Sequence, residues 1–226
     1  MNKKLFMTLV ALVAATASLQ ATIITSGDET YIRSGAADSN LNGEDRILIG
    51  FHNSGHLKAM RGVFEFDLTS VTEPIDSISL TLNRESFTSG DQESGQFDLL
   101  LKNLNTDFDE TSVTWNTFSP SGGDVSGTTL STVDAYNAST ITSATFNSTT
   151  DFLNAANASA GGIFRVIVYS PGAEGLAGTG TSSDIKSFYR FTDSASLEYS
   201  VIPEPSSFAM ILIGFAACIM VYRRRA

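Results

Sequence analysis

Cysteine is almost absent from this chain of 226 residues, and the single one, Cys218, lies in an apolar stretch near the C-terminus. The part of the chain before it therefore has no disulfide, no thiolate nucleophile and no cysteine ligand for a metal. A domain without such cross-links depends on a packed apolar core for its stability, with bound ions as a further source.

Sequence motifs that mark common enzyme classes are also missing. The chain contains neither a G-x-S-x-G nucleophile elbow nor an H-E-x-x-H zinc motif. Asp107, Asp109 and Glu110 form a carboxylate group of the kind that can hydrolyse glycosides. In so acidic a chain, however, such groups are usually solvated loop residues, and we predict that the protein is not an enzyme.

Histidine occurs only twice, at His52 and His56, on either side of a turn sequence. Two imidazoles across a hairpin turn could approach closely enough to bind zinc. No third ligand is evident, so we favour solvated turn histidines.

Basic residues are few, with 14 against 24 acidic ones and a net charge of −10. Without Lys3, Lys4, Glu204 and Arg223–Arg225, 9 basic and 23 acidic residues remain, a net charge of −14. This balance excludes nucleic acid as a partner, because phosphate contacts need clustered lysines and arginines. It also repels acidic polysaccharides unless the basic residues gather in a cleft.

Long apolar runs occur only at the two ends. At the N-terminus, Asn2–Lys4 is positively charged, Leu5–Ala15 is apolar and Thr16–Ala21 is rich in small residues. This order is typical of a secretory signal peptide, here predicted over residues 1–21 as a signal helix. Cleavage after Ala17 or after Ala21 fits the small-residue rule, and we favour Ala21.

At the C-terminus, Pro203-Glu204-Pro205 precedes the uncharged segment Phe208–Tyr222 and the basic stop Arg223-Arg224-Arg225. The prolines keep the chain extended for a processing enzyme. The uncharged segment spans roughly 22 Å as a helix, short of a hydrocarbon core of about 30 Å, yet long enough where the bilayer thins. Arg223–Arg225 stay on the cytoplasmic side, which leaves the body of the protein outside.

These residues resemble a PEP-CTERM sorting tail, here residues 202–226 with one transmembrane helix. The resemblance implies processing by an exosortase-type enzyme at the motif Pro203, Glu204, Pro205, with Arg223, Arg224 and Arg225 as the stop. A permanent membrane anchor that is never cut is the alternative interpretation.

Between the two ends, short alternating apolar runs separated by Gly, Ser, Asn and Asp predict an all-β domain over residues 22–201. We expect strands at Thr30–Arg33, Arg46–Phe51, Met60–Leu68, Ser77–Asn83, Phe97–Leu104, Ser112–Asn116, Leu130–Asp134, Ile141–Phe146, Gly162–Ser170, Phe188–Thr192 and Leu197–Val201. Only Thr149–Asn157 reads as a helix, capped by Thr149 or Thr150. Ser119–Thr129 and Pro171–Ser183 read as loops.

The order of these segments resembles a DNRLRE domain, related to the family 96 carbohydrate-binding modules. The segments that carry the resemblance are Asp28–Arg33, Asn40–Gly43, Ile47–Gly50, Arg61–Leu68, Ile78–Leu82 and Asp109–Asn116. It implies a jelly-roll-like antiparallel β-sandwich, a secreted or cell-surface location, and polysaccharide binding in some members.

Candidate carbohydrate-binding residues are Trp115, whose ring could stack on a sugar, and the scarce arginines Arg33, Arg61 and Arg190. A core or strand-edge position is the favoured interpretation for Trp115. For Arg61, an ion pair with Glu65 on the same strand face is favoured over a groove for uronate or sulfate groups.

Asp38-x-Asn40-x-Asn42-Gly43 has the oxygen spacing of a calcium loop, which makes Asp38, Asn40 and Asn42 the candidate ligands of a structural calcium ion. The position of the bidentate glutamate in such loops is Ile49 here, and an Asn/Gly turn is the favoured alternative.

Together these features predict an exported, non-catalytic β-sandwich protein that associates with extracellular polysaccharide at the cell surface or in the matrix. The membrane is its partner before processing. The alternative is a structural or adhesive protein of the envelope or biofilm matrix without a specific ligand, in which sugars attached to Ser/Thr loops provide the adhesion.

Overall fold

The computed structural model describes residues 21–52, 58–85, 97–116, 125–136, 142–175 and 186–202. The predicted signal peptide (except Ala21), the sorting motif Pro203–Pro205, the stop Arg223–Arg225 and His56 lie outside these residues. In the described part of the chain, no helix has both the length and the apolar character to cross a membrane.

The described residues form ten strands, two short helices and one 3-10 turn. The strands are β1 (Ala21–Thr25), β2 (Asp28–Arg33), β3 (Arg46–His52), β4 (Lys58–Asp67), β5 (Ile75–Arg84), β6 (Phe97–Leu104), β7 (Val125–Tyr136), β8 (Ser143–Phe146), β9 (Ile163–Tyr169) and β10 (Lys186–Val201). The helices are α2 (Thr150–Ser159) and α3 (Pro171–Glu174), and the turn is η1 (Ser34–Ala36).

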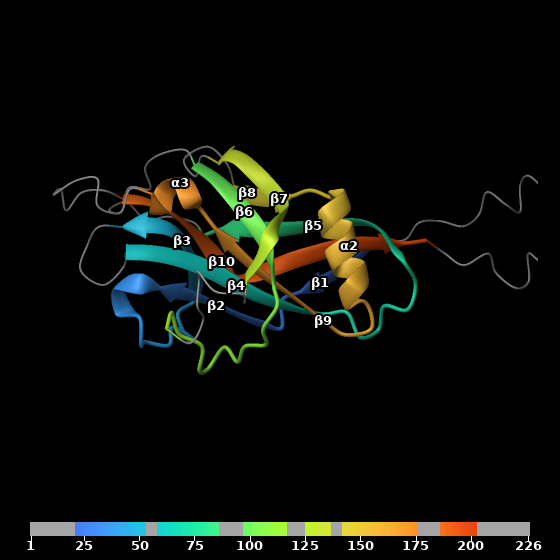
Figure 1. The fold of residues 1–226 in the computed structure, drawn as a ribbon, viewed down its shortest axis with the longest axis horizontal. Helices are drawn as coiled ribbons and strands as arrows, with labels where there is room; N and C mark the ends of the chain where they lie inside the picture. The colour runs from blue at the N-terminus through green and yellow to red at the C-terminus, as the bar shows by residue number, and fades with distance from the viewer. Residues whose placement is uncertain are drawn as a thin grey trace, which may run out of the picture.

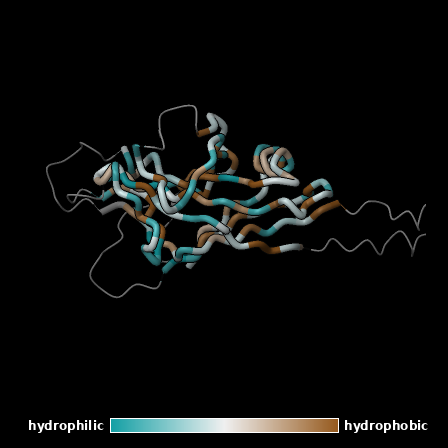
Figure 2. Tube along the Cα trace, turned by 90° about the horizontal axis from the view of Figure 1, so that it is seen from below, coloured by the Kyte–Doolittle hydropathy of each residue, from teal (hydrophilic) through white to brown (hydrophobic). Residues whose placement is uncertain are grey.

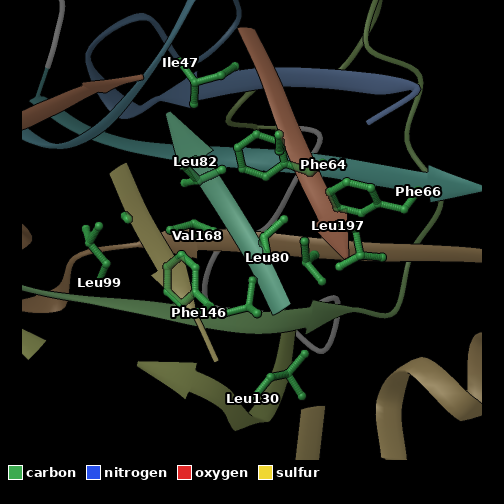
Figure 3. Packing of buried hydrophobic residues seen from close by; sticks show 14 of the residues in the cluster. Ile47, Phe64, Phe66, Leu80, Leu82, Leu99, Leu130, Phe146, Val168 and Leu197 are labelled. Carbon is green, nitrogen blue, oxygen red and sulfur yellow. The ribbon is translucent and has the colours of Figure 1, made fainter. Parts of the chain in front are cut away.

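All ten strands belong to one sheet in the order β7-β6-β9-β4-β3-β10-β5-β8, with β1 on β10 and β2 on β4. Each pairing is antiparallel. The sheet folds back on itself, so that side chains of β4, β6 and β9 meet those of β5, β8 and β10 in one apolar core (Figures 1 and 3). The prediction of an all-β antiparallel domain is confirmed.

Strand β3 joins the two halves of the sheet. Its residues 46–52 pair with β10, and its last three residues also pair with the start of β4. Gly50 takes part in both pairings, opposite Phe188 and Met60. Its φ of 126° is a conformation that residues with a Cβ rarely adopt, so glycine lets β3 bend between the two halves.

The alternation predicted for β4 is confirmed. Met60, Phe64 and Phe66 point into the main core, whereas Val63 belongs to a second apolar cluster on the other face of the strand. Figure 2 shows the same alternation of hydrophobic and hydrophilic residues along several strands. Gly62 lies on the core side, where a Cβ would approach Ile47 Cγ2 of the facing half to 2.8 Å.

Helix α2 covers one end of the core and confirms the predicted helix. The hydroxyl of Thr149, the predicted cap, accepts the Phe152 N–H at 3.1 Å. The buried Phe152 ring stacks on Phe164 with centroids 6.0 Å apart. Asn157 binds the backbone of Ile75 in both directions, which ties the helix to the start of β5.

Other predicted boundaries were wrong because hydrogen bonding overrides local composition. Val125–Thr129, expected as loop, belongs to β7, and Pro171–Glu174 forms α3. The two strands predicted near the C-terminus are one strand, β10, with a register shift between Phe191 and Ala195. Strand β1 was not predicted at all.

The predicted strand Ser112–Asn116 was also wrong. Asp109 folds this segment into a turn, because its carboxylate accepts the Thr111 N–H at 2.8 Å and its carbonyl accepts the Val113 N–H at 2.9 Å. Residues 105–116, which we call the covering loop, place Phe108 and Val113 against the outer face of the sheet in the second cluster.

The side-chain amide of Asn40 fastens the covering loop to the segment after β2. It donates to the carbonyl oxygens of Glu110 at 2.7 Å and Val113 at 2.8 Å. Trp115, at the end of the loop, packs on the second cluster. Asn40, together with the Ala37 carbonyl that accepts the Asn116 N–H at 3.0 Å, therefore sets the position of the only tryptophan in the chain.

We expect Gly62→Ala to destabilise the fold by about 1–3 kcal/mol, because the new methyl group meets Ile47 across the core. In a double-mutant cycle with Ile47→Ala, the double variant should lose less stability than the sum of the two single variants. The second change removes the shortest contact and leaves only those with the Phe64 ring at 3.0 and 3.1 Å. Urea unfolding measures the free energy of unfolding of each variant. Full additivity of the two changes would contradict the contact between residue 62 and Ile47.

We expect Asn40→Ala to lower the free energy of unfolding by about 1–3 kcal/mol, because two partly buried carbonyl groups lose their donor. The emission of Trp115 should shift to longer wavelength as its ring becomes hydrated. Asn83→Ala, at an exposed position of β5, is the control. Unchanged emission and stability in Asn40→Ala would show that the loop is held by other contacts.

Candidate functional site

Arg61 projects from the outer face of β4, beside the covering loop. Its register partner on β2 is Ile32, which belongs to the second cluster. Around Arg61 lie Lys102 of β6, Trp115 of the covering loop, Tyr169 of β9 and Glu174 of α3. We call these five residues the Arg61 site. Four separate parts of the chain meet there around one strand residue.

The guanidinium of Arg61 forms a two-pronged ion pair with Glu174. Nε lies 2.9 Å from Oε1 and Nη2 lies 2.7 Å from Oε2. Both side chains are largely buried, with exposed fractions of 14% and 15%. An arginine–carboxylate pair with this geometry is among the stronger polar contacts in proteins.

The predicted ion pair between Arg61 and Glu65 was therefore wrong. The two residues share a face of β4, but four residues along a strand separate them by about 13 Å. Glu65 instead accepts from Arg165 of β9 at 2.8 Å, and Arg165 also contacts Asp107 at 2.5 Å. Burial raises the pKa of Glu65, against the opposing effect of Arg165.

Two aromatic rings flank the Arg61 guanidinium. Its central carbon lies 5.1 Å from the centroid of Trp115 and 4.9 Å from that of Tyr169, within the range of cation–π attraction. Lys102 Nζ lies 5.9 Å from the Tyr169 centroid and donates to the carbonyl of Gly127 at 3.1 Å. Both rings are half-buried, so part of each faces solvent.

The other predicted arginines do not join this site. Arg33 lies on the face of β2 opposite to Ile32, near Tyr31, whose hydroxyl donates to Glu44 at 3.1 Å. Burial, with Glu44 adding to it, raises the pKa of Tyr31 to about 12. Arg190 is on β10, in the other half of the sheet, 3.6 Å from Glu85. Of the four predicted sugar-binding residues, the fold brings together Arg61 and Trp115.

The residues of the predicted calcium loop make hydrogen bonds to the covering loop. Asp38 accepts from the Asn116 amide at 2.7 Å, and Asn42 donates to the Glu110 carboxylate at 3.2 Å. The Asn40 side-chain oxygen accepts the Asn42 N–H at 3.0 Å, which is the predicted Asn turn. Within the described ranges, no group of three His, Cys, Asp or Glu residues is arranged to hold a metal. Calcium binding there stays a prediction.

His52 differs from the solvated turn histidine that we expected. It is buried at the end of β3, with its ring edge-on to Phe188 at 5.4 Å between centroids. The burial follows from the length of β10, whose first residue pairs with His52.

Sequence reasoning missed Lys102 and Glu174. Lys102 looks like any solvated lysine on an alternating strand, and Glu174 lies in a stretch that reads as a loop. Neither carries a local signal of its role, because each meets Arg61 or Tyr169 only through the packing of strands distant in the sequence.

The chain was compared with curated proteins, solved structures and models of protein families. No curated protein matches the chain. A solved structure, the crystal structure of dimeric latent PorU from Porphyromonas gingivalis, matches at 14% identity over 82% of this chain and 14% of that one. Its TM-score of 0.26 carries no argument about the fold. The model of carbohydrate-binding module family 96 matches residues 20–163, more than half of the chain. This protein therefore belongs to carbohydrate-binding module family 96.

Proposed function

We propose that this protein is an exported, non-catalytic module that binds extracellular polysaccharide through the Arg61 site. Family membership is the observation that carries the proposal. The site supports it, because half-buried rings beside fixed hydrogen-bonding groups are the usual components of a site for an uncharged or polar ligand.

The chemistry of the Arg61 site suits sugars in two ways. The exposed parts of Trp115 and Tyr169 offer apolar surface to the C–H groups of a pyranose ring. The Arg61–Glu174 pair holds donors and acceptors side by side, with Lys102 as a further donor. Adjacent sugar hydroxyls both donate and accept, so they match such an arrangement.

We also propose that the two ends of the chain direct its export and its sorting to the cell surface. Ala21, where the described body begins, pairs with Ser200 of β10, so the body begins and ends on adjacent strands at one end of the molecule (Figure 1). We propose that a signal peptide precedes this end and that a DNRLRE-type, jelly-roll-like body is joined there to a PEP-CTERM tail. An exosortase-type enzyme then releases the body to the cell surface or matrix.

Affinity electrophoresis of the full chain through gels that contain neutral, uronate or sulfated polysaccharides tests the binding. We expect retardation by at least one polymer, reduced about fivefold or more in affinity by Trp115→Ala and by Lys102→Ala, equivalent to about 1 kcal/mol. Arg46→Ala removes one positive charge from a surface pair with Glu44 and is the control. No retardation by any polymer would favour the alternative of a structural matrix protein without a specific ligand.

The intact mass of the protein recovered from its own cells tests the delivery. We expect a chain that begins near Thr22 and ends near Pro205, whereas replacing Pro203 and Pro205 by alanine should leave the tail attached in the membrane fraction. A mass above that of the bare truncated polypeptide would reveal attached sugars. A soluble cytoplasmic chain that retains Met1 and Ala226 would contradict the whole delivery route.

A further inference from the structure

Asn42-Gly43 is the only Asn-Gly pair in the chain, and it lies in an exposed turn before β3. The Leu41 carbonyl accepts the Glu44 N–H at 3.3 Å across this pair. Gly43 has a φ of 92°, a conformation that the third residue of a type II turn requires. A Cβ at Gly43 would meet no heavy atom within 4 Å, so the turn has open space around it. The side-chain amide of Asn42 is therefore followed by a backbone nitrogen that no side chain shields.

This arrangement permits a reaction whose only other reactant is water. The Gly43 backbone nitrogen bonds to Cγ of Asn42 while the Cγ–Nδ2 bond breaks, and ammonia leaves with the proton of that backbone nitrogen. The product is a five-membered succinimide ring, which adds water at either of its two carbonyl groups. Ring opening leaves aspartate or isoaspartate at position 42, so a negative charge replaces a neutral amide.

The neutral amide of Asn42 helps to hold the covering loop. Its Nδ2 donates to Glu110 Oε1 at 3.2 Å, and the second carboxylate oxygen of Glu110 accepts the Glu29 N–H at 3.3 Å. A carboxylate at position 42 has no proton to donate, and its charge has the same sign as that of Glu110. Conversion of Asn42 therefore replaces an attraction between the turn and the loop by a repulsion.

From the turn and these contacts we infer that Asn42 is a site of deamidation in the folded protein, and that the new charge loosens the covering loop. The hydrogen bonds from Asn40 to the loop remain, so the change is partial and the sheet stays folded. Trp115 lies on the same loop, and hydration of its ring reports the loosening. This inference goes beyond the proposed function and does not depend on it.

Incubation of the full chain in mildly alkaline buffer, followed by peptide mass spectrometry, tests the reaction, because the attacking nitrogen must lose its proton. We expect conversion at Asn42 to be at least about tenfold faster than at Asn147, which is also exposed but precedes Ser148. Asn42→Gln should resist conversion, because its longer side chain has to close a six-membered ring. Equal rates at Asn42 and Asn147 in the folded chain would overturn the assignment of the site.

Asn42→Asp tests the effect of the charge on the covering loop. We expect the emission of Trp115 to shift to longer wavelength and the urea midpoint to fall. The double variant Asn42→Asp/Glu110→Gln exchanges the acceptor and the donor between the two positions, and it should return both values toward those of the unmodified chain. Asn83→Asp adds the same charge at an exposed position of β5 and is the matched control, with unchanged emission.

The incubated chain gives an independent measure of the same change. Its emission should shift in proportion to the conversion at position 42, and the emission of incubated Asn42→Gln should stay constant. Unchanged emission of both the converted chain and Asn42→Asp would overturn the loosening of the covering loop. A double variant that keeps the shifted emission would overturn the part played by Glu110.

Discussion

Strand β3 is the element on which the rest of the structure depends, because it pairs with both halves of the folded sheet. Without a disulfide in the body, the two apolar faces stay together through this strand, through the core between them and through helix α2. The Thr149 hydroxyl before this helix donates to the Leu130 carbonyl of β7, and Asn157 binds the Ile75 backbone of β5. Gly50 lets β3 bend, and Gly62 lets the facing half approach within contact of Ile47. Two glycines thus determine how closely the halves pack, and Figure 3 shows the side chains that fill the space between them.

The outer face of the sheet follows from the same packing. The inner side chains of β4 and β9 pack in the main core. Their outer side chains pack against a second layer, which the covering loop supplies. The loop brings Trp115 beside Arg61, and α3, which follows β9 directly, brings Glu174. The Arg61 site is therefore formed where the covering loop and α3 lie on the sheet. Its rigidity depends on the hydrogen bonds from Asn40 that hold the covering loop.

Several of the few arginines of this acidic protein form ion pairs with its carboxylates. Arg46, Arg61, Arg165 and Arg190 each lie within 4 Å of a carboxylate, with Arg46 Nε 3.4 Å from Glu44 Oε2. Scarce positive charge on an acidic body suggests a groove for anions when only the sequence is known. In the fold, those charges instead pair with carboxylates of a neighbouring strand (Arg165), of helix α3 (Arg61) or of the same segment (Arg46).

The sequence by itself determined the all-β class, most strand positions, the helix capped by Thr149 or Thr150 and the absence of disulfides, because these depend on local periodicity and composition. It also identified Arg61 and Trp115, which are rare residue types in this chain. Only the tertiary structure decided that Glu174 rather than Glu65 pairs with Arg61, that Ser112–Asn116 turns instead of pairing, and that His52 is buried. The pairing of Arg61 and the burial of His52 join segments that only the register and folding-back of the sheet bring together, which no short stretch of sequence encodes. The turn at Ser112–Asn116 is made locally by Asp109, and it is held in place by Asn40, which is distant in the sequence.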